Sequence, residues 1–85
     1  MKTKDIIKHE FIGLELEVTD SKNESDLGIM GRIIDETRNT FLVNTDKGKK
    51  RLFKSNITFK IRINKKMYKI NGKILIGNPK DRIKK

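Results

Sequence analysis

Apolar and polar residues alternate with a period of two along most of this chain. Leu14, Leu16 and Val18 alternate with polar neighbours, and residues 57–63 repeat the same pattern. Because successive side chains of a strand point to opposite faces of a sheet, this alternation predicts half-buried β-strands. Shorter segments of similar character predict further strands over residues 27–35, 40–45, 49–53, 67–70 and 73–76.

Turn-forming residues separate these segments. Asn71-Gly72 is typical of a two-residue hairpin turn, because both residue types tolerate a positive φ. Gly28 and Gly31 fall within one expected strand, where glycine often marks a bend or bulge. Several short, bent strands predict an all-β fold, a small and strongly bent antiparallel barrel that is closed rather than flat. Chain reversals are also expected at residues 37–39, 46–48 and 64–66.

The two ends of the chain lie outside this series of strands. Thr3 can cap a short helix over residues 4–10, and Pro79 is typical of the first position of a helix. A chain of 85 residues is long enough for one small domain. We therefore expect an N-terminal helix and extension over residues 1–13, a barrel over residues 14–77, and a basic tail or short helix over residues 78–85.

Positive charge is concentrated in the C-terminal half. Residues 37–85 carry sixteen Lys/Arg and two acids, a net charge of +14, whereas residues 1–36 carry five and nine, a net of −4. This asymmetry predicts a polyanionic partner, a nucleic acid, for the basic half. The cations expected to contact its phosphates are Arg38, Lys47, Lys49, Lys50, Arg51, Lys54, Lys73, Lys80, Arg82, Lys84 and Lys85.

Candidate catalytic residues are few. The chain has no cysteine, which excludes disulfides and thiolate metal sites, and His9 is its only histidine. Asp35-Glu36 is the only adjacent acid pair, and we expect it to cap a turn or form a salt bridge rather than hold a metal. The sequence therefore predicts a protein that is not an enzyme by itself and that binds no metal or cofactor.

No apolar run approaches the roughly 20 residues that span a bilayer. The N-terminal residues also make a poor signal peptide. We therefore expect a cytoplasmic protein that does not bind membranes.

Aromatic side chains bear on how a nucleic acid would be bound. Phe41, Phe53 and Phe59 occupy positions expected to face the core. Only Tyr68 is a candidate for stacking on a base, and a core role for it is at least as well supported. These assignments favour contact with the backbone of folded or double-stranded nucleic acid over base reading.

Apolar residues are concentrated near the N-terminus. Phe11 is expected to pack the N-terminal helix onto the barrel. The cluster has more apolar surface than a short helix can obviously bury, so we expect part of it to dock a partner. Covering an open end of the barrel is an equally good explanation. The partner-binding candidates are Ile6, Ile7, Phe11 and Ile12.

Three segments, residues 9–14, 28–40 and 71–85, share their order and spacing with one family. Together they resemble protein component 1 of archaeal ribonuclease P, the Sm-like subunit also found in the eukaryotic enzyme. The resemblance covers residues 9–85, and the segment from Gly31 to Thr40 is its most specific part. It implies a bent, Sm-like antiparallel barrel preceded by a helix.

The resemblance also implies a function. The family member is a non-catalytic subunit of the ribonucleoprotein that removes 5′ leaders from precursor tRNA, in which the RNA performs the chemistry with Mg²⁺. It pairs with a small zinc-binding protein subunit, and the two act on the specificity domain of the RNA, so that contact with precursor tRNA is indirect. We hypothesise that the acidic N-terminal half meets the partner subunit and the basic half meets RNA.

Two other classes fit the same composition. One is another basic RNA-binding barrel, such as a ribosomal or Sm-type ring protein, and a ring former would assemble into a homo-oligomer. The other is an architectural protein that coats DNA. A structure-specific nuclease is a more distant alternative, which Mg²⁺-dependent cleavage without an RNA subunit would reveal.

Overall fold

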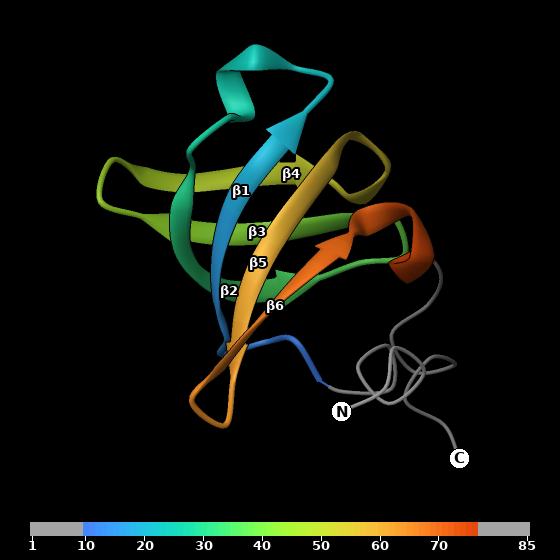
Figure 1. The fold of residues 1–85 in the computed structure, drawn as a ribbon. Helices are drawn as coiled ribbons and strands as arrows, with labels where there is room; N and C mark the ends of the chain where they lie inside the picture. Colours follow the sequence, from blue (N-terminus) through green and yellow to red (C-terminus); the bar gives the residue numbers. More distant parts are fainter. Residues whose placement is uncertain (1–9, 77–85) are drawn as a thin grey trace.

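A computed structural model of the chain describes residues 10–76, which form one antiparallel sheet and short 3₁₀ helices (Figure 1). The all-β prediction is therefore confirmed. The expected N-terminal helix lies almost wholly outside the described residues, as does the C-terminal tail. The strands are β1 (Glu15–Ser21), β2 (Met30–Glu36), β3 (Thr40–Thr45), β4 (Gly48–Phe53), β5 (Ile57–Ile63) and β6 (Lys66–Asn71). The 3₁₀ helices are η1 (Glu24–Asp26), η2 (Lys54–Asn56) and η3 (Gly72–Leu75).

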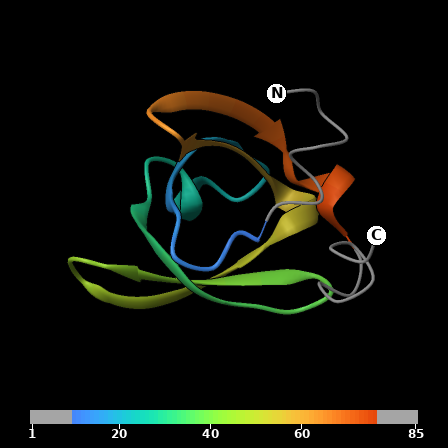
Figure 2. The same ribbon diagram turned by 90° about the horizontal axis from the view of Figure 1, so that it is seen from below.

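The six strands are arranged in the order β4-β3-β2-β1-β5-β6, and neighbouring strands are antiparallel. The sheet is strongly bent and curls around its core, as expected (Figure 2). It does not close, because β4 and β6 stand at the two ends of the order and each pairs on one side only. The expectation of a closed barrel is therefore not confirmed.

Local irregularities bend the strands. The register shifts between Val18 and Asp20 in β1, and between Ile33 and Asp35 in β2. Such bulges bend a strand and increase its twist. A Cβ atom at Gly31 would collide with the backbone oxygen of Asn44 in β3, so glycine is required where β2 approaches its neighbour. The sequence predicted a bend or bulge near this glycine, and the structure shows a close contact between strands at Gly31.

The core is built around three phenylalanine rings. The ring centroid of Phe41 lies 5.8 Å from that of Phe11 and 5.6 Å from that of Phe59. All three side chains are fully buried, which confirms the expectation for Phe41 and Phe59. The expectation for Phe53 is wrong, because its side chain is 54% exposed. Leu52 is the β4 residue that points into the core, and strand alternation then directs Phe53 outward.

Most predicted turns are confirmed. The chain reverses between β2 and β3 and between β3 and β4, and Asn64 and Lys65, with φ of 51° and 69°, form the β5–β6 turn. The hairpin predicted at Asn71-Gly72 and the strand over residues 73–76 are wrong. Asn71 instead caps η3, since its Oδ1 accepts from the Lys73 N–H at 3.0 Å. Here the Asn-Gly pair starts a 3₁₀ helix.

Candidate nucleic-acid interface

Strand β4 presents basic residues along an edge of the sheet. It pairs only with β3, in a register that places Lys49 opposite Asn44, Arg51 opposite Leu42 and Phe53 opposite Thr40. Paired residues share a face, and alternate residues of a strand share one too. Lys49, Arg51 and Phe53 therefore lie on the outer face of β4, and we call this group the β4 outer row.

The cations of β4 differ in their local partners. The Nη1 of Arg51 donates to the Thr40 Oγ1 at 3.1 Å, while Lys49 is exposed on the same face. Lys50 faces the other way, and its Nζ lies 3.7 Å from Oδ1 of Asp26, whose carboxylate is nearly buried. This ion pair partly neutralises Lys50. The β4 outer row is thus the side of the strand that presents the more accessible charge.

The predicted cations of the neighbouring turns are also exposed. Lys47 lies in the β3–β4 turn, where its N–H donates to the Thr45 Oγ1 at 3.1 Å. The hairpin that carries Lys47 and Lys49 extends beyond the rest of the sheet (Figures 1 and 2). Arg38 is exposed in the turn at the other end of β3. Exposed cations therefore flank the β3–β4 hairpin at both of its ends.

Lys54 does not belong to this surface. Its side chain is fully buried, and its Nζ lies 2.7 Å from Oε2 of Glu36. The same ammonium donates to the carbonyl oxygens of Thr37 at 2.8 Å and Leu75 at 3.0 Å, and it lies 5.0 Å from the Phe41 ring centroid. The prediction that Lys54 contacts RNA is therefore wrong. The salt bridge predicted for the acid pair is confirmed at Glu36.

We call Lys54, Glu36 and the two carbonyl oxygens of Thr37 and Leu75 the lysine clasp. It joins the end of β2, the β2–β3 turn, η2 and η3 around one buried ammonium. Three parts of the chain that are distant in sequence, Glu36-Thr37, Lys54 and Leu75, thus share one internal charge.

A second set of cations lies on strands β5 and β6. Lys60 of β5 lies directly opposite Lys69 of β6 on one side and opposite Glu17 of β1 on the other. Like charges that face each other across a ladder are destabilising, and a bound anion would relieve that repulsion. Lys73 is exposed at η3, as expected for a phosphate contact. The basic surface therefore extends beyond the β3–β4 hairpin.

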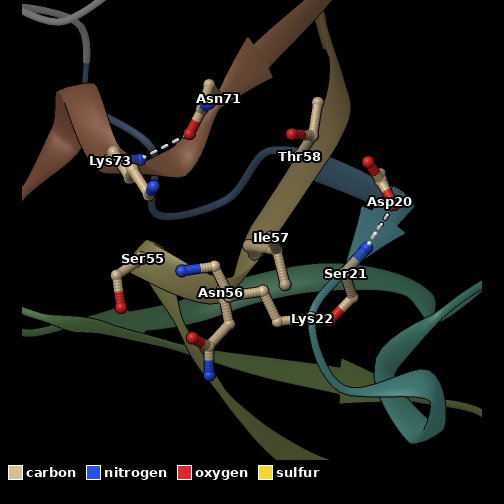
Figure 3. A pocket seen from close by; sticks show the side chains of 9 residues that line it. All are labelled: Asp20, Ser21, Lys22, Ser55, Asn56, Ile57, Thr58, Asn71 and Lys73. Atoms are coloured by element: carbon tan, nitrogen blue, oxygen red, sulfur yellow. Dashed lines mark hydrogen bonds between the residues drawn. The ribbon is translucent and has the colours of Figure 1, made fainter.

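A polar cleft of about 200 Å³ opens between the end of β1, η2, the start of β5 and η3 (Figure 3). Lys22 and Lys73 line it together with Ser55, Asn56 and Asp20. The Asp20 carboxylate would repel a phosphate there, and its Oδ1 accepts from the neighbouring Ser21 N–H at 2.9 Å. The cleft is thus a weaker candidate for phosphate binding than the β4 outer row.

The predicted partner-binding residues have different environments. Phe11 is fully buried against the Phe41 ring, so its inclusion in a partner surface is wrong, and the helix that it was expected to pack onto the barrel lies almost wholly outside the described residues. Ile12 is 44% exposed and remains available to a partner. Four basic residues of the tail and two isoleucines lie outside the described residues: Lys80, Arg82, Lys84, Lys85, Ile6 and Ile7.

Within residues 10–76, no cluster of three or more His, Cys, Asp or Glu side chains could hold a metal ion. His9 lies outside this range. No helix in the described part of the chain is long and apolar enough to cross a membrane.

Known proteins match nearly the whole chain. The family model described as ribonuclease P/MRP, subunit p29, matches residues 4–85. Ribonuclease P protein component 1 of Methanosphaera stadtmanae is 46% identical over 83 residues, which span 96% of this chain and 89% of the relative. Ribonuclease P protein component 1 of Methanocaldococcus jannaschii is 37% identical over 82 residues, which span 95% of this chain and 86% of the relative.

A solved structure shares the fold. The structure of Mth11, a homologue of human RNase P protein Rpp29, superposes with a TM-score of 0.63 at 35% identity, covering 88% of this chain and 99% of the other. The resemblance noted from the sequence is therefore confirmed, both by sequence comparison and by structure.

Proposed function

Because this chain belongs to the ribonuclease P/MRP p29 family, we propose that it is a non-catalytic, RNA-binding subunit of ribonuclease P. In this role it supports the removal of 5′ leaders from precursor tRNA, while the RNA performs the phosphodiester chemistry with Mg²⁺ and the protein binds no cofactor. The observation that best supports the proposal is the line of exposed cations on the projecting β3–β4 hairpin.

The physical basis is phosphate neutralisation. Lysine and arginine side chains that approach phosphates release condensed counterions, and this release drives sequence-independent binding. Lys47, Lys49 and Arg51 lie along one hairpin, so they can follow a single stretch of RNA backbone. Such contacts fix the position and orientation of the subunit on the RNA. We therefore propose that this chain binds and stabilises the folded RNA and does not cleave it.

We also propose a protein partner, the small zinc-binding subunit of ribonuclease P, with which this chain would act on the specificity domain of the RNA. Support comes from the exposed Ile12 beside an acidic N-terminal half. Precursor tRNA would be contacted only indirectly, and the assembly would work in the cytoplasm.

Reconstitution tests the proposal. An archaeal ribonuclease P RNA should process precursor tRNA faster with the full protein set than with the same set lacking this chain. The chain alone should cleave nothing, and His9→Ala and Asp35→Asn should keep reconstituted activity within a few-fold. Leader removal by the chain without RNA, lost in either variant, would contradict a non-catalytic role.

Binding and size measurements separate the other classes. A DNA-coating protein would bind random duplex DNA as tightly as structured ribonuclease P RNA, and a ring former would run as a homo-oligomer in solution. We expect a clear preference for the structured RNA and no homo-oligomeric ring.

A further inference from the structure

We infer that Phe53 and Arg51 form a stacking platform for one unpaired RNA base, with Lys49 placed to contact a phosphate of the same strand. The inference rests on the proposed RNA-binding function and adds a ligand class to it, namely a nucleotide outside a duplex. It also gives a role to a phenylalanine that hydrophobicity alone would place in the core.

The first support is the placement of Phe53. Scattered exposed apolar residues are common, so exposure alone carries little weight. Phe53, however, shares one face of an edge strand with two cations, at alternate positions along β4. Proteins that bind single-stranded nucleic acids combine these two features, a basic path for the backbone and an aromatic ring for the bases.

The second support is the position of the Arg51 guanidinium. Its Nη1 donates to Oγ1 of Thr40, and Thr40 is the residue directly opposite Phe53 in the β3–β4 ladder. The hydroxyls of Thr40 and Thr37 lie 2.6 Å apart and share a hydrogen bond. The guanidinium is thereby held at the residue that lies opposite Phe53 across the ladder. Both aromatic rings and guanidinium planes stack on unpaired bases.

The third support is the rigidity of the backbone next to the ring. The N–H of Lys54 donates to the Asn39 carbonyl at 2.8 Å, and the Lys54 side chain enters the lysine clasp. The residue that follows Phe53 is therefore anchored at both its backbone and its side chain. A platform on such a support loses little conformational freedom when a base binds, which favours affinity.

These features define the ligand. Bases inside a duplex are stacked on one another, so only a nucleotide in a loop, a bulge or a single-stranded segment can reach a protein ring. Phenylalanine offers no hydrogen-bonding group, so we expect little preference for base identity. The ligand class is therefore an unpaired nucleotide of any base within a structured RNA.

The test compares two RNA probes of one length, a 12-nucleotide oligouridine and a blunt 12-base-pair RNA duplex. Phe53→Ala should weaken oligouridine binding about 5- to 160-fold, the range for one stacked base, and change duplex binding less than twofold. Phe53→Trp should restore binding, and Phe53→Leu should not. Met67→Ala is the matched control, because Met67 is 51% exposed on the other edge strand, opposite Arg62. It should leave both affinities unchanged.

Other outcomes would overturn the inference. Equal losses on both probes, or full rescue by leucine, would show that the ring does not stack on a base. Unchanged RNA affinity in Phe53→Ala would mean that the exposed ring serves something else, such as a protein contact. Circular dichroism melting confirms that each variant is folded. None of these results affects the proposed RNA-binding function, which fails separately if neutralising Lys49, Lys50 and Arg51 leaves RNA affinity intact.

Discussion

Arg51 and Lys54 are three residues apart, yet their charges are used in opposite ways. Arg51 lies on the outer face of β4, with its guanidinium held at the rim by Thr40. Lys54 points into the protein and joins three distant parts of the chain through one ammonium. The charges of the β4 outer row are exposed, so a ligand can reach them. The ammonium of the lysine clasp is instead paired with a carboxylate inside the protein.

Neighbouring cations of a basic segment therefore do not form one surface. A buried ammonium is tolerated only where a carboxylate and hydrogen-bond acceptors replace its water. An exposed cation keeps its hydration and contributes little to folding, so it remains free to bind phosphates. The comparison predicts that removing Lys54 damages stability first and that removing the exposed cations damages RNA binding alone.

The largest expected effect is that of Lys54→Met. Removal of the ammonium takes away the 2.7 Å ion pair of the nearly buried Glu36 carboxylate with Lys54, and breaking a buried pair of this kind costs about 3–5 kcal/mol of unfolding free energy. Urea denaturation followed by circular dichroism measures the loss. The double variant Lys54→Met with Glu36→Leu should recover much of it, because both charges are then absent. A loss below about 1 kcal/mol in the single variant would contradict the lysine clasp.

A smaller loss is expected from Gly72→Ala. A Cβ atom at this position would collide with the Lys54 carbonyl oxygen, where η3 packs on η2. Overpacking of this kind typically costs about 1–3 kcal/mol. Lys73→Ala, one residue later and exposed, is the matched control and should stay within about 0.5 kcal/mol of the parent protein. Equal stability of the two variants would show that the contact can relax.

The smallest of these effects concerns the proposed partner surface. Ile12→Ser should weaken association with the zinc-binding subunit by about 1–2 kcal/mol, since the exposed part of the side chain no longer buries apolar area. Isothermal titration calorimetry measures it. Ile74→Ser provides the control, because that isoleucine is exposed on η3. Similar losses in both variants would argue against a specific role for Ile12.

The strand pattern could be predicted from the sequence because alternation reports burial on one face. The same alternation contained the signal for Phe53, since the buried Leu52 precedes it and neighbours on a strand point apart. Phe53 is expected in the core when its hydrophobicity is given more weight than its place in the alternation. The correct interpretation required knowing which face of β4 meets the core.

Lys54 and Asn71 could not be assigned from local sequence. Lys54 is one cation among many, and its burial depends on Glu36 and Leu75, which are distant in the chain. Asn71-Gly72 satisfies the rule for a hairpin, but packing against η2 selects a 3₁₀ helix there. Barrel closure likewise depends on whether β4 and β6 meet, which no single segment determines.

The salt dependence of binding to ribonuclease P RNA tests whether the exposed cations of the basic half bind phosphates. The variant with Lys49, Lys50 and Arg51 replaced by Ala is compared with one that neutralises Lys2, Lys4 and Lys8, since each removes three positive charges. The first triple should make the negative slope of log K against log salt shallower by about 2–3. The change is somewhat less if the Asp26 ion pair keeps Lys50 from RNA. The second triple should leave the slope nearly unchanged. Equal slopes for the two variants would contradict a directional RNA-binding surface.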